Sequence, residues 1–383
     1  MALKVAINGF GRIGRTVFRI GQGRQEIDFV AINDLADIAE LAHLLKYDSV
    51  HGVFGHEVAI RGNELVVRGK KTAIYSTAEP DRLPWGQIGV DIVLECTGGF
   101  TNGRDAAGHL RAGAKKVIVS APADGADVTV IPGVNDDALN LNEHRVISMG
   151  SCTANCLAPI LAVLDGEYGI VSGFMTTVHA YTKDQPLVDS VHRDLRRGRA
   201  AGLSMVPTTT GAFKAIFKVM PHLEDRINGI SIRVPTPNVS LVDLVVTTRR
   251  EVDRKGINRV FMEYADGPLE GILSCEEESL VSCDFNGNGS SAVIDLPSTQ
   301  VIDGHTANIV AWYDNECGFS NRLIDLMLAA VDTKFQESHL CQPVSFSPGI
   351  RLRSGLRSGL AGPTHDDKSN HGLDSDEGRH TYG

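Results

Sequence analysis

Short apolar runs alternate with amphipathic segments over the first 150 residues of the chain. The apolar runs predict buried strands over residues 4–7, 29–32, 90–95, 116–120 and 145–148. Apolar positions at helical spacing follow the first run and recur over 36–45 and 104–112. Strands that alternate with helices are typical of a mainly parallel sheet covered on both faces, so this part of the chain predicts an α/β domain.

The pattern changes after residue 151. An apolar run over 157–164 predicts a buried helix, and β-rich segments follow at 170–178, 227–234, 240–249, 291–294 and 306–312. Few helical patterns separate these segments, so they predict a mainly antiparallel sheet in an α+β domain. Helical spacing resumes at Ser320, and we expect that helix to return to the first domain. The expected division is therefore 1–150 with a returning helix at 318–334, then 151–317, then a tail at 335–383.

Composition narrows the class of protein. A length of 383 residues exceeds one ordinary domain, and a net charge of -10 argues against general nucleic-acid binding. Seven cysteines without metal-ligand spacing fit a reducing compartment and predict no metal site. The chain opens on a strand and has no apolar run of bilayer length, so we expect a cytoplasmic protein without a membrane partner or a dedicated nucleic-acid site. The Gly- and Ser-rich tail predicts disorder.

A glycine-rich turn follows the first strand. Gly9, Gly11 and Gly14 form a G-x-G-x-x-G pattern that leads into a helix, and Asp34 ends the second strand 20 residues further on. Such glycines let the backbone approach a pyrophosphate at a helix N-terminus, and the acid accepts hydrogen bonds from ribose hydroxyls. The pattern therefore predicts a Rossmann-like domain that binds NAD, because a carboxylate repels the 2′-phosphate of NADP. Two further candidates at strand ends are Thr97 and Ser120.

A cysteine stands at the start of the buried helix, in the sequence Gly-Ser-Cys-Thr-Ala-Asn-Cys at 150–156. The positive end of a helix dipole and its unpaired N–H groups favour a thiolate at Cys152, and they could stabilise an oxyanion on a carbonyl that the sulfur attacks. The alternative is that Cys152 is a small core residue, since free cysteines are usually buried and inert. Residues 180–206 are dense in Arg, Asp and His without a sustained period, and irregular segments of that length are usually functional.

Several segments together resemble the glyceraldehyde-3-phosphate dehydrogenases. They are residues 7–15, 151–159, 178–182, 207–211, 233–238 and 312–316, and the resemblance runs in order from about residue 2 to residue 334. It implies oxidative phosphorylation of the aldehyde of D-glyceraldehyde 3-phosphate to 1,3-bisphosphoglycerate with NAD, in glycolysis or gluconeogenesis. It also implies that Cys152 forms a thiohemiacetal, that His179 is the general base, and that phosphate attacks the resulting thioester.

The resemblance implies roles for other residues. Thr182 and Arg233 are similar to the pair that holds the substrate's phosphate. Asn315 is similar to the residue that holds the nicotinamide carboxamide, and Arg12 and Ile13 join the glycines in the cofactor motif. The residues implied for the attacking phosphate are Ser151, Thr153, Arg197, Thr210 and Gly211. The 180–206 segment resembles a loop that packs across subunits, which implies a homotetramer.

The chain also departs from the family pattern. Ala78 stands where an arginine near the adenine ribose is usual, and Ser190-Val191 replaces a Leu-Pro that many NAD-specific members carry. Ala154 replaces a threonine, and Cys317 replaces a common tryptophan. Two other functions stay open at this point: an erythrose-4-phosphate dehydrogenase, which hydrolyses the thioester, and a non-catalytic scaffold or RNA-associated protein.

Overall fold

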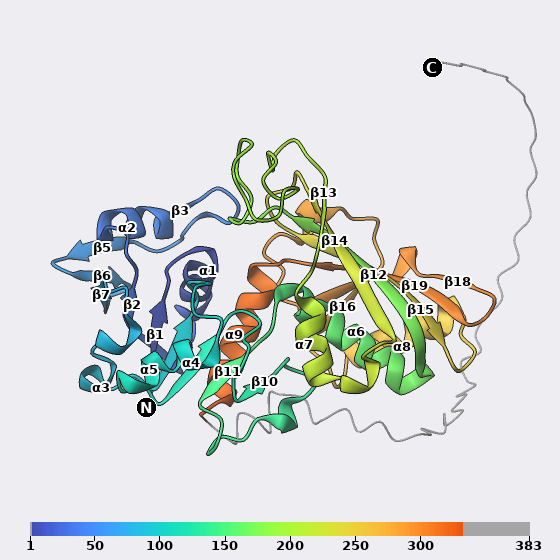
Figure 1. Cartoon of the computed structure of the whole chain (residues 1–383), viewed down its shortest axis with the longest axis horizontal. Helices are drawn as coiled ribbons and strands as arrows, with labels where there is room; N and C mark the ends of the chain where they lie inside the picture. Colours follow the sequence, from blue (N-terminus) through green and yellow to red (C-terminus); the bar gives the residue numbers. More distant parts are fainter. Residues whose placement is uncertain (1, 332–383) are drawn as a thin grey trace, which may run out of the picture. The chain divides into compact units, whose positions relative to one another are not determined.

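The computed structural model describes residues 2–331, which contain two large sheets (Figure 1). Met1 and residues 332–383 lie outside the described part. The predicted disordered tail at 335–383 and the last residues of the predicted returning helix, 332–334, therefore lie outside it too.

The first sheet follows the strand order β10-β11-β9-β8-β1-β2-β7-β6-β5. It is parallel except at β5, β6 and β7, which pair antiparallel at one edge. Its strands are β1 (Leu3–Asn8), β2 (Ile27–Asn33), β5 (Val58–Arg61), β6 (Glu64–Val67), β7 (Lys70–Tyr75), β8 (Ile92–Glu95), β9 (Lys116–Val119), β10 (Val128–Thr129) and β11 (Val146–Ser148). A separate two-stranded hairpin is formed by β3 (Tyr47–Asp48) and β4 (Gly52–Val53). The predicted α/β class is confirmed.

Helices cover both faces of this sheet. Alternate residues of β1 point to opposite sides, so Val5 and Ile7 join one core and Ala6 joins another. The helices of this part are α1 (Arg12–Gly21), α2 (Ile38–Lys46), α3 (Trp85–Ile88), α4 (Gly103–Ala106) and α5 (Gly108–Arg111). The single helix predicted over 104–112 is two short helices instead. Gly108 lies at the break, and glycine is a poor former of helix interiors.

The second sheet follows the order β13-β14-β12-β15-β19-β17-β16, with β18 paired to β19. Its strands are β12 (Ile170–Ala180), β13 (Val206–Thr208), β14 (Ile227–Val234), β15 (Ser240–Thr248), β16 (Leu273–Glu276), β17 (Ala292–Asp295), β18 (Gln300–Ile302) and β19 (Thr306–Tyr313). Most pairs are antiparallel, as predicted; β12 with β14 and β16 with β17 are parallel. The helices that pack against this sheet are α6 (Cys152–Tyr168), α7 (Ala212–Val219) and α8 (Arg254–Ala265). The sequence patterns predicted α6 and missed α7 and α8.

Short 3₁₀ helices lie in several connections. They are η1 (Pro80–Arg82), η2 (Asp136–Ala138), η3 (Pro221–Leu223), η4 (Ser282–Phe285) and η5 (Leu296–Ser298). The segment between β12 and β13 has no helix or strand, in agreement with the irregular pattern of 180–206.

The last helix of the described residues, α9 (Cys317–Ala329), returns to the first sheet. Its Leu323 and Leu326 belong to the same core as Val5 and Ile7. Cys152, at the start of α6, packs against both this core and the core of the second sheet. The predicted nucleophile therefore lies at the junction of the two halves, where residues from both can reach it.

Candidate active site

The glycine-rich turn has the geometry that a dinucleotide requires. Gly9 has a φ of +92°, and a Cβ there would lie 2.6 Å from the backbone nitrogen of Thr97. A Cβ on Gly14 would lie 2.3 Å from the carbonyl oxygen of Gly9, so both glycines allow close packing. A Cβ on Gly11, the N-cap of α1, would meet nothing within 4 Å. Gly11 therefore borders open space at a helix N-terminus, where backbone can approach a pyrophosphate.

The polar candidates at strand ends share one edge of the first sheet. Strands β2, β1, β8 and β9 are neighbours in that order, and Asp34, Thr97 and Ser120 follow three of them. The Asp34 carboxylate accepts hydrogen bonds from the N–H groups of Phe10 (2.7 Å) and Ala36 (3.0 Å). The turn thus holds this carboxylate in a fixed orientation, while its remaining lone pairs are available to ribose hydroxyls.

A buried carboxylate, which sequence patterns missed, organises this edge. Glu95 is 2 % exposed and accepts hydrogen bonds from Asn8 and from both the N–H (2.7 Å) and the hydroxyl of Thr97. His109 lies 3.2 Å from the same carboxylate. Trp85 donates to Nδ1 of His109, so the proton of that imidazole is on Nε2, facing Glu95. Glu95 therefore ties the loop after β8 to the end of β1.

Cys152 and His179 form a thiol–imidazole pair. Ser151 is the N-cap of α6, and its hydroxyl accepts a hydrogen bond from the N–H of Ala154 at 3.1 Å. Cys152 follows as the first helical residue, and its Sγ lies 3.6 Å from Nε2 of His179, near the end of β12. Cys156, one turn further along α6, is fully buried in the core.

Electrostatics keep both members of the pair neutral in the folded chain. Burial raises the pKa of Cys152, although the charge of Arg233 and hydrogen bonds from Thr153 oppose that shift. The helix N-terminus favours the thiolate as the sequence indicates, but burial outweighs it. Burial and the nearby Arg233 lower the pKa of His179 to about 3, so the imidazole is an uncharged base at neutral pH.

Neighbouring groups orient the imidazole. Nδ1 of His179 lies 2.7 Å from the carbonyl oxygen of Ala180, which can only accept, so Nδ1 carries the proton and Nε2 faces the thiol with its lone pair. The ring of Tyr313 stands edge-on to that of His179, with centroids 5.9 Å apart. The Tyr313 hydroxyl lies 2.9 Å from that of Thr153 and 2.8 Å from that of Thr177.

The predicted anion-binding residues fall into separate groups. Arg233 pairs with His179 across β14 and β12, and its Nη1 donates to the hydroxyl of Thr182 at 3.1 Å, so the structure joins the first predicted pair. Arg197 donates to Thr208, Asp184 and the carbonyl of Thr209, and its charge contributes to lowering the pKa of Arg233, which burial lowers most. Thr210 and Gly211 lie at the N-terminus of α7. Thr153 is held by Tyr313.

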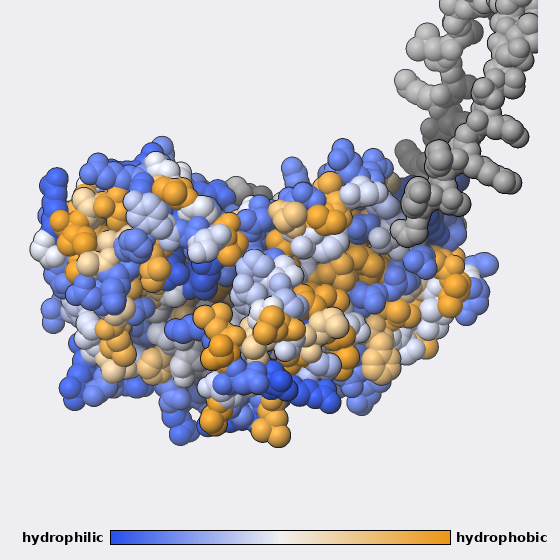
Figure 2. Space-filling model, turned by 90° about the horizontal axis from the view of Figure 1, so that it is seen from above, coloured by the Kyte–Doolittle hydropathy of each residue, from blue (hydrophilic) through white to orange (hydrophobic). Residues whose placement is uncertain are grey.

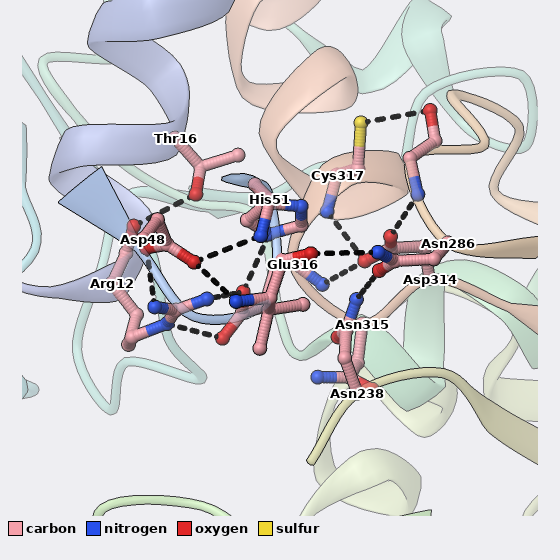
Figure 3. A network of polar contacts seen from close by, with 12 residues as sticks. Arg12, Thr16, Asp48, His51, Asn238, Asn286, Asp314, Asn315, Glu316 and Cys317 are labelled. Carbon is pink, nitrogen blue, oxygen red and sulfur yellow. Dashed lines mark hydrogen bonds and ion pairs between the residues drawn. The ribbon is translucent and has the colours of Figure 1, made fainter. Parts of the chain in front are cut away.

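A charged network flanks Asn315, between β19 and α9 (Figure 3). Arg12, the first residue of α1, donates two hydrogen bonds to Glu316 and one to Asp48 at 2.5 Å. Nε2 of His51 lies 2.7 Å from the Glu316 carboxylate. The guanidinium of Arg12 is therefore engaged within the chain, and its backbone N–H at the start of α1 is the group left for the cofactor motif.

The other flank of Asn315 is fixed by backbone contacts. The Asp314 carboxylate accepts from the N–H groups of Glu316 (2.9 Å), Cys317 (2.8 Å) and Gly287 (2.7 Å). Asn286 donates to the carbonyl of Val50 at 2.9 Å and so links the second half of the chain to the β3–β4 hairpin. Sequence patterns gave no signal for the contacts of Asp314 with Gly287 and of Asn286 with Val50, because 27 and 236 residues separate the partners.

Among residues 2–331, no group of three or more His, Cys, Asp or Glu side chains could hold a metal ion. None of the helices in that range is both long and apolar enough to cross a membrane.

The fold and these contacts define an NAD-dependent oxidoreductase with a thiol–imidazole pair beside its cofactor domain. The NAD binding domain of glyceraldehyde 3-phosphate dehydrogenase matches residues 3–103, and the C-terminal domain of the same enzyme matches residues 151–315. The chain belongs to the glyceraldehyde-3-phosphate dehydrogenase family.

Bacterial relatives agree with this assignment. The chain is 55% identical over 326 residues to glyceraldehyde-3-phosphate dehydrogenase of Geobacillus stearothermophilus, covering 85% of this chain and 97% of that one. It is 53% identical over 326 residues to glyceraldehyde-3-phosphate dehydrogenase 1 of Bacillus subtilis, with the same coverage. It is 51% identical over 331 residues to the enzyme of Xanthobacter flavus, covering 86% and 98%. The predicted family and the predicted cofactor, NAD, are confirmed.

Proposed function

We propose that the chain oxidises and phosphorylates the aldehyde of D-glyceraldehyde 3-phosphate to 1,3-bisphosphoglycerate in central carbon metabolism. The observation that carries this proposal is the 3.6 Å approach of Cys152 Sγ to His179 Nε2 beside Arg233. Relatives that bear the enzyme's name share half or more of their residues with this chain. Residues 1–150 with the returning helix hold the cofactor in this proposal, and residues 151–317 carry the reacting groups.

The first step uses the neutral pair. Nε2 of His179 takes the proton of the Cys152 thiol as sulfur attacks the aldehyde carbon, which gives a thiohemiacetal. The carbonyl oxygen becomes negative, and backbone N–H groups at the start of α6 are the donors available to it. The imidazole has the tautomer that this step needs, because its Nδ1–H is already bound to the carbonyl oxygen of Ala180 and Nε2 is free to take the proton.

Oxidation and phosphorylation follow on the same sulfur. The glycine-rich turn, Asp34 and Asn315 would hold NAD, which would supply the acceptor for the hydride of the thiohemiacetal carbon. His179, protonated in the first step, gives that proton to the oxyanion and takes it back as the hydride leaves and the carbonyl reforms, which leaves a thioester on Cys152. Inorganic phosphate then attacks the thioester carbon and releases its proton to solvent, the carbon–sulfur bond breaks, and the proton on His179 returns to the Cys152 sulfur as the acyl phosphate departs.

Two anion sites serve the two phosphates. Arg233 and Thr182 would hold the substrate's phosphate, since they already share a hydrogen bond beside His179. Ser151, Thr153, Arg197, Thr210 and Gly211 would receive the attacking phosphate. The hydroxyls, the helix N-terminus of α7 and the guanidinium are donors suited to that anion.

Steady-state turnover with NAD, with and without inorganic phosphate, tests this function. Glyceraldehyde 3-phosphate should be oxidised over many turnovers only when phosphate is present. Equal turnover without phosphate, or a preference for erythrose 4-phosphate, would favour the hydrolytic alternative instead. A protein that binds NAD but turns over neither aldehyde would favour the scaffold.

We propose a cytoplasmic homotetramer as the working form. The 180–206 loop exposes apolar side chains, with Leu187 86%, Leu195 86% and Leu203 87% exposed. It rises from the upper side of the molecule in Figure 1, and Figure 2, which looks onto that side, shows apolar surface there. Phe174 (69% exposed) and Ile230 (49%) lie on the face of the second sheet opposite α6 and α8, which suggests a second interface. Two distinct interfaces are what a tetramer with dihedral symmetry needs. Light scattering that gives an active monomer would contradict this assembly.

A further inference from the structure

Ser240 lies between the groups that orient the base and the groups that orient the cofactor. It is the first residue of β15, is 1% exposed, and faces Tyr313 in the register of β15 with β19. Its hydroxyl accepts a hydrogen bond from the N–H of Ala180 at 3.1 Å and donates one to Oδ1 of Asn315 at 2.9 Å. One small side chain therefore contacts both halves of the proposed site.

At Asn315, the contact decides which end of the carboxamide is free. The serine proton occupies Oδ1, so the amide nitrogen, with its two N–H donors, is the end left for a ligand. In the function proposed above, on which this step rests, that nitrogen would donate to the nicotinamide carboxamide. A flipped Asn315 would place oxygen against oxygen and favour the other face of the ring.

At His179, the contact acts through Ala180. Ser240 takes the N–H of Ala180 at the end of β12, and the carbonyl of the same residue holds Nδ1–H of His179 at 2.7 Å. Both backbone polar groups of Ala180 are thus occupied, one by the serine and one by the base. The position of the Nε2 lone pair relative to Cys152 depends on this arrangement.

We propose that Ser240 is a positioning residue that sets both the amide orientation of Asn315 and the direction of the His179 imidazole. It does not touch substrate in this role. The two hydrogen bonds of its hydroxyl link the direction of the His179 imidazole, which faces the Cys152 thiol, to the orientation of the Asn315 amide, which would contact the cofactor.

The test compares Ser240→Ala with Ser231→Ala in the full chain. Ser231 is a matched control because it is 2% exposed on β14, which pairs with β12 in the same sheet, and its hydroxyl has no hydrogen-bond partner within residues 2–331. We expect Ser240→Ala to weaken NAD binding by about fivefold to tenfold, the effect of one lost hydrogen bond. Oxidation of a substrate deuterated at the aldehyde carbon should then leave measurable label on the second face of the reduced nicotinamide, whereas wild type and Ser231→Ala label one face.

Two further readouts separate the effect of Ser240 on Asn315 from its effect on His179. In an Asn315→Ala background, Ser240→Ala should no longer change NAD affinity, because the contact is already gone. In the same background, Ser240→Ala should still change the pH profile of Cys152 alkylation by iodoacetamide without cofactor, because Ser240 contacts His179 through Ala180 and not through Asn315. If Ser240→Ala matches Ser231→Ala in affinity, labelled face and alkylation profile, the proposal is wrong. Failure of the proposed function would instead appear as a wild-type protein that does not turn over the aldehyde.

Discussion

Arg12 and Glu316 are joined by two hydrogen bonds although 304 residues separate them in the sequence. Hydrogen bonds and charge from Glu316 and Asp48 outweigh burial and raise the pKa of Arg12, so the guanidinium stays charged at all working pH values. At Asp48, burial raises the pKa, but hydrogen bonds from the backbone N–H groups of His51 and Val50 and the charge of Arg12 outweigh burial and lower the pKa to about 2. The pair fixes the start of α1 against the start of α9, directly beside Asn315.

Breaking this pair should cost both stability and cofactor affinity. Glu316→Gln removes the charge that compensates a partly buried arginine, so we expect a loss of about 2 kcal/mol and a fall of about 4 °C in the thermal midpoint. NAD affinity should fall severalfold because Asn315 adjoins the lost contact. Glu64→Gln is the control, since its partner Lys71 has a side chain 61% exposed and such pairs contribute little. Similar effects of the two substitutions would contradict this role.

The two cysteines of α6 should respond differently to the same substitution. Cys152→Ser should abolish turnover while leaving folding and NAD binding intact, because the side-chain volume barely changes and an alcohol is a far weaker nucleophile than a thiol. Cys156 is fully buried, and burial raises its pKa well above the usual value, so Cys156→Ser should keep substantial activity. Activity assays on both variants decide the matter. An active Cys152→Ser with an inactive Cys156→Ser would reverse the assignment.

His179 should make the folded chain acid-sensitive. Its pKa is about 3 when folded and about 6.5 when unfolded, so between these values the unfolded chain binds a proton that the folded chain does not. Stability therefore falls as the pH drops through that window. Relative to its own value at pH 7, His179→Gln should lose about 2 kcal/mol less than wild type at pH 5.

Denaturant unfolding at several pH values measures this difference. Cys152→Ser is the control, because it lacks activity yet keeps the imidazole, so it should retain the acid sensitivity of wild type. Parallel pH curves for wild type and His179→Gln would show that the imidazole is not buried in its neutral form.

Cofactor choice should depend on Asp34. Its carboxylate is held by Phe10 and Ala36, so it cannot turn away from a 2′-phosphate without losing those hydrogen bonds. Asp34→Asn keeps an oxygen acceptor and removes the charge, and we expect kcat/KM with NADP to rise about tenfold, equivalent to about 1.4 kcal/mol. Asp37→Asn, which removes the same charge three residues away, should leave the ratio of NAD to NADP unchanged. A wild-type preference for NADP would show that the absence of the Leu-Pro pair at Ser190-Val191 outweighs the charge of the Asp34 carboxylate.

The C-terminal tail should be dispensable. Residues 343–383 carry five Lys or Arg and five Asp or Glu, so they offer no net field to a phosphate-binding cleft, and their few leucines are separated by Gly and Ser. A chain that ends at Glu337 should keep its kinetic constants and thermal midpoint. A several-fold rise in activity, or loss of the tetramer, on truncation would contradict this expectation.

Local chemistry explains what the sequence could predict. The turn at Gly9 and the Cys152 helix are each defined within a few residues, so their patterns indicated strand, helix and function directly. Tyr313, Ser240 and Glu95 carry no such pattern, because each looks like an ordinary strand residue until the fold brings its partners close. Thr153 and Tyr313, for example, are 160 residues apart. The sequence predicted one helix where α4 and α5 lie, because the apolar spacing continues across Gly108, where the structure has a break.

The return of α9 has a consequence for the synthesis of the chain. Domains generally fold in the order in which the ribosome delivers them, N-terminal part first. Here the core around Val5 and Ile7 is completed by Leu323 and Leu326, which are among the last described residues to be made. A nascent or prematurely terminated chain that stops before α9 leaves that apolar surface open and lacks Glu316 for Arg12. Such fragments are targets for chaperones and proteases, and the cofactor site is assembled only when the core of the chain is complete.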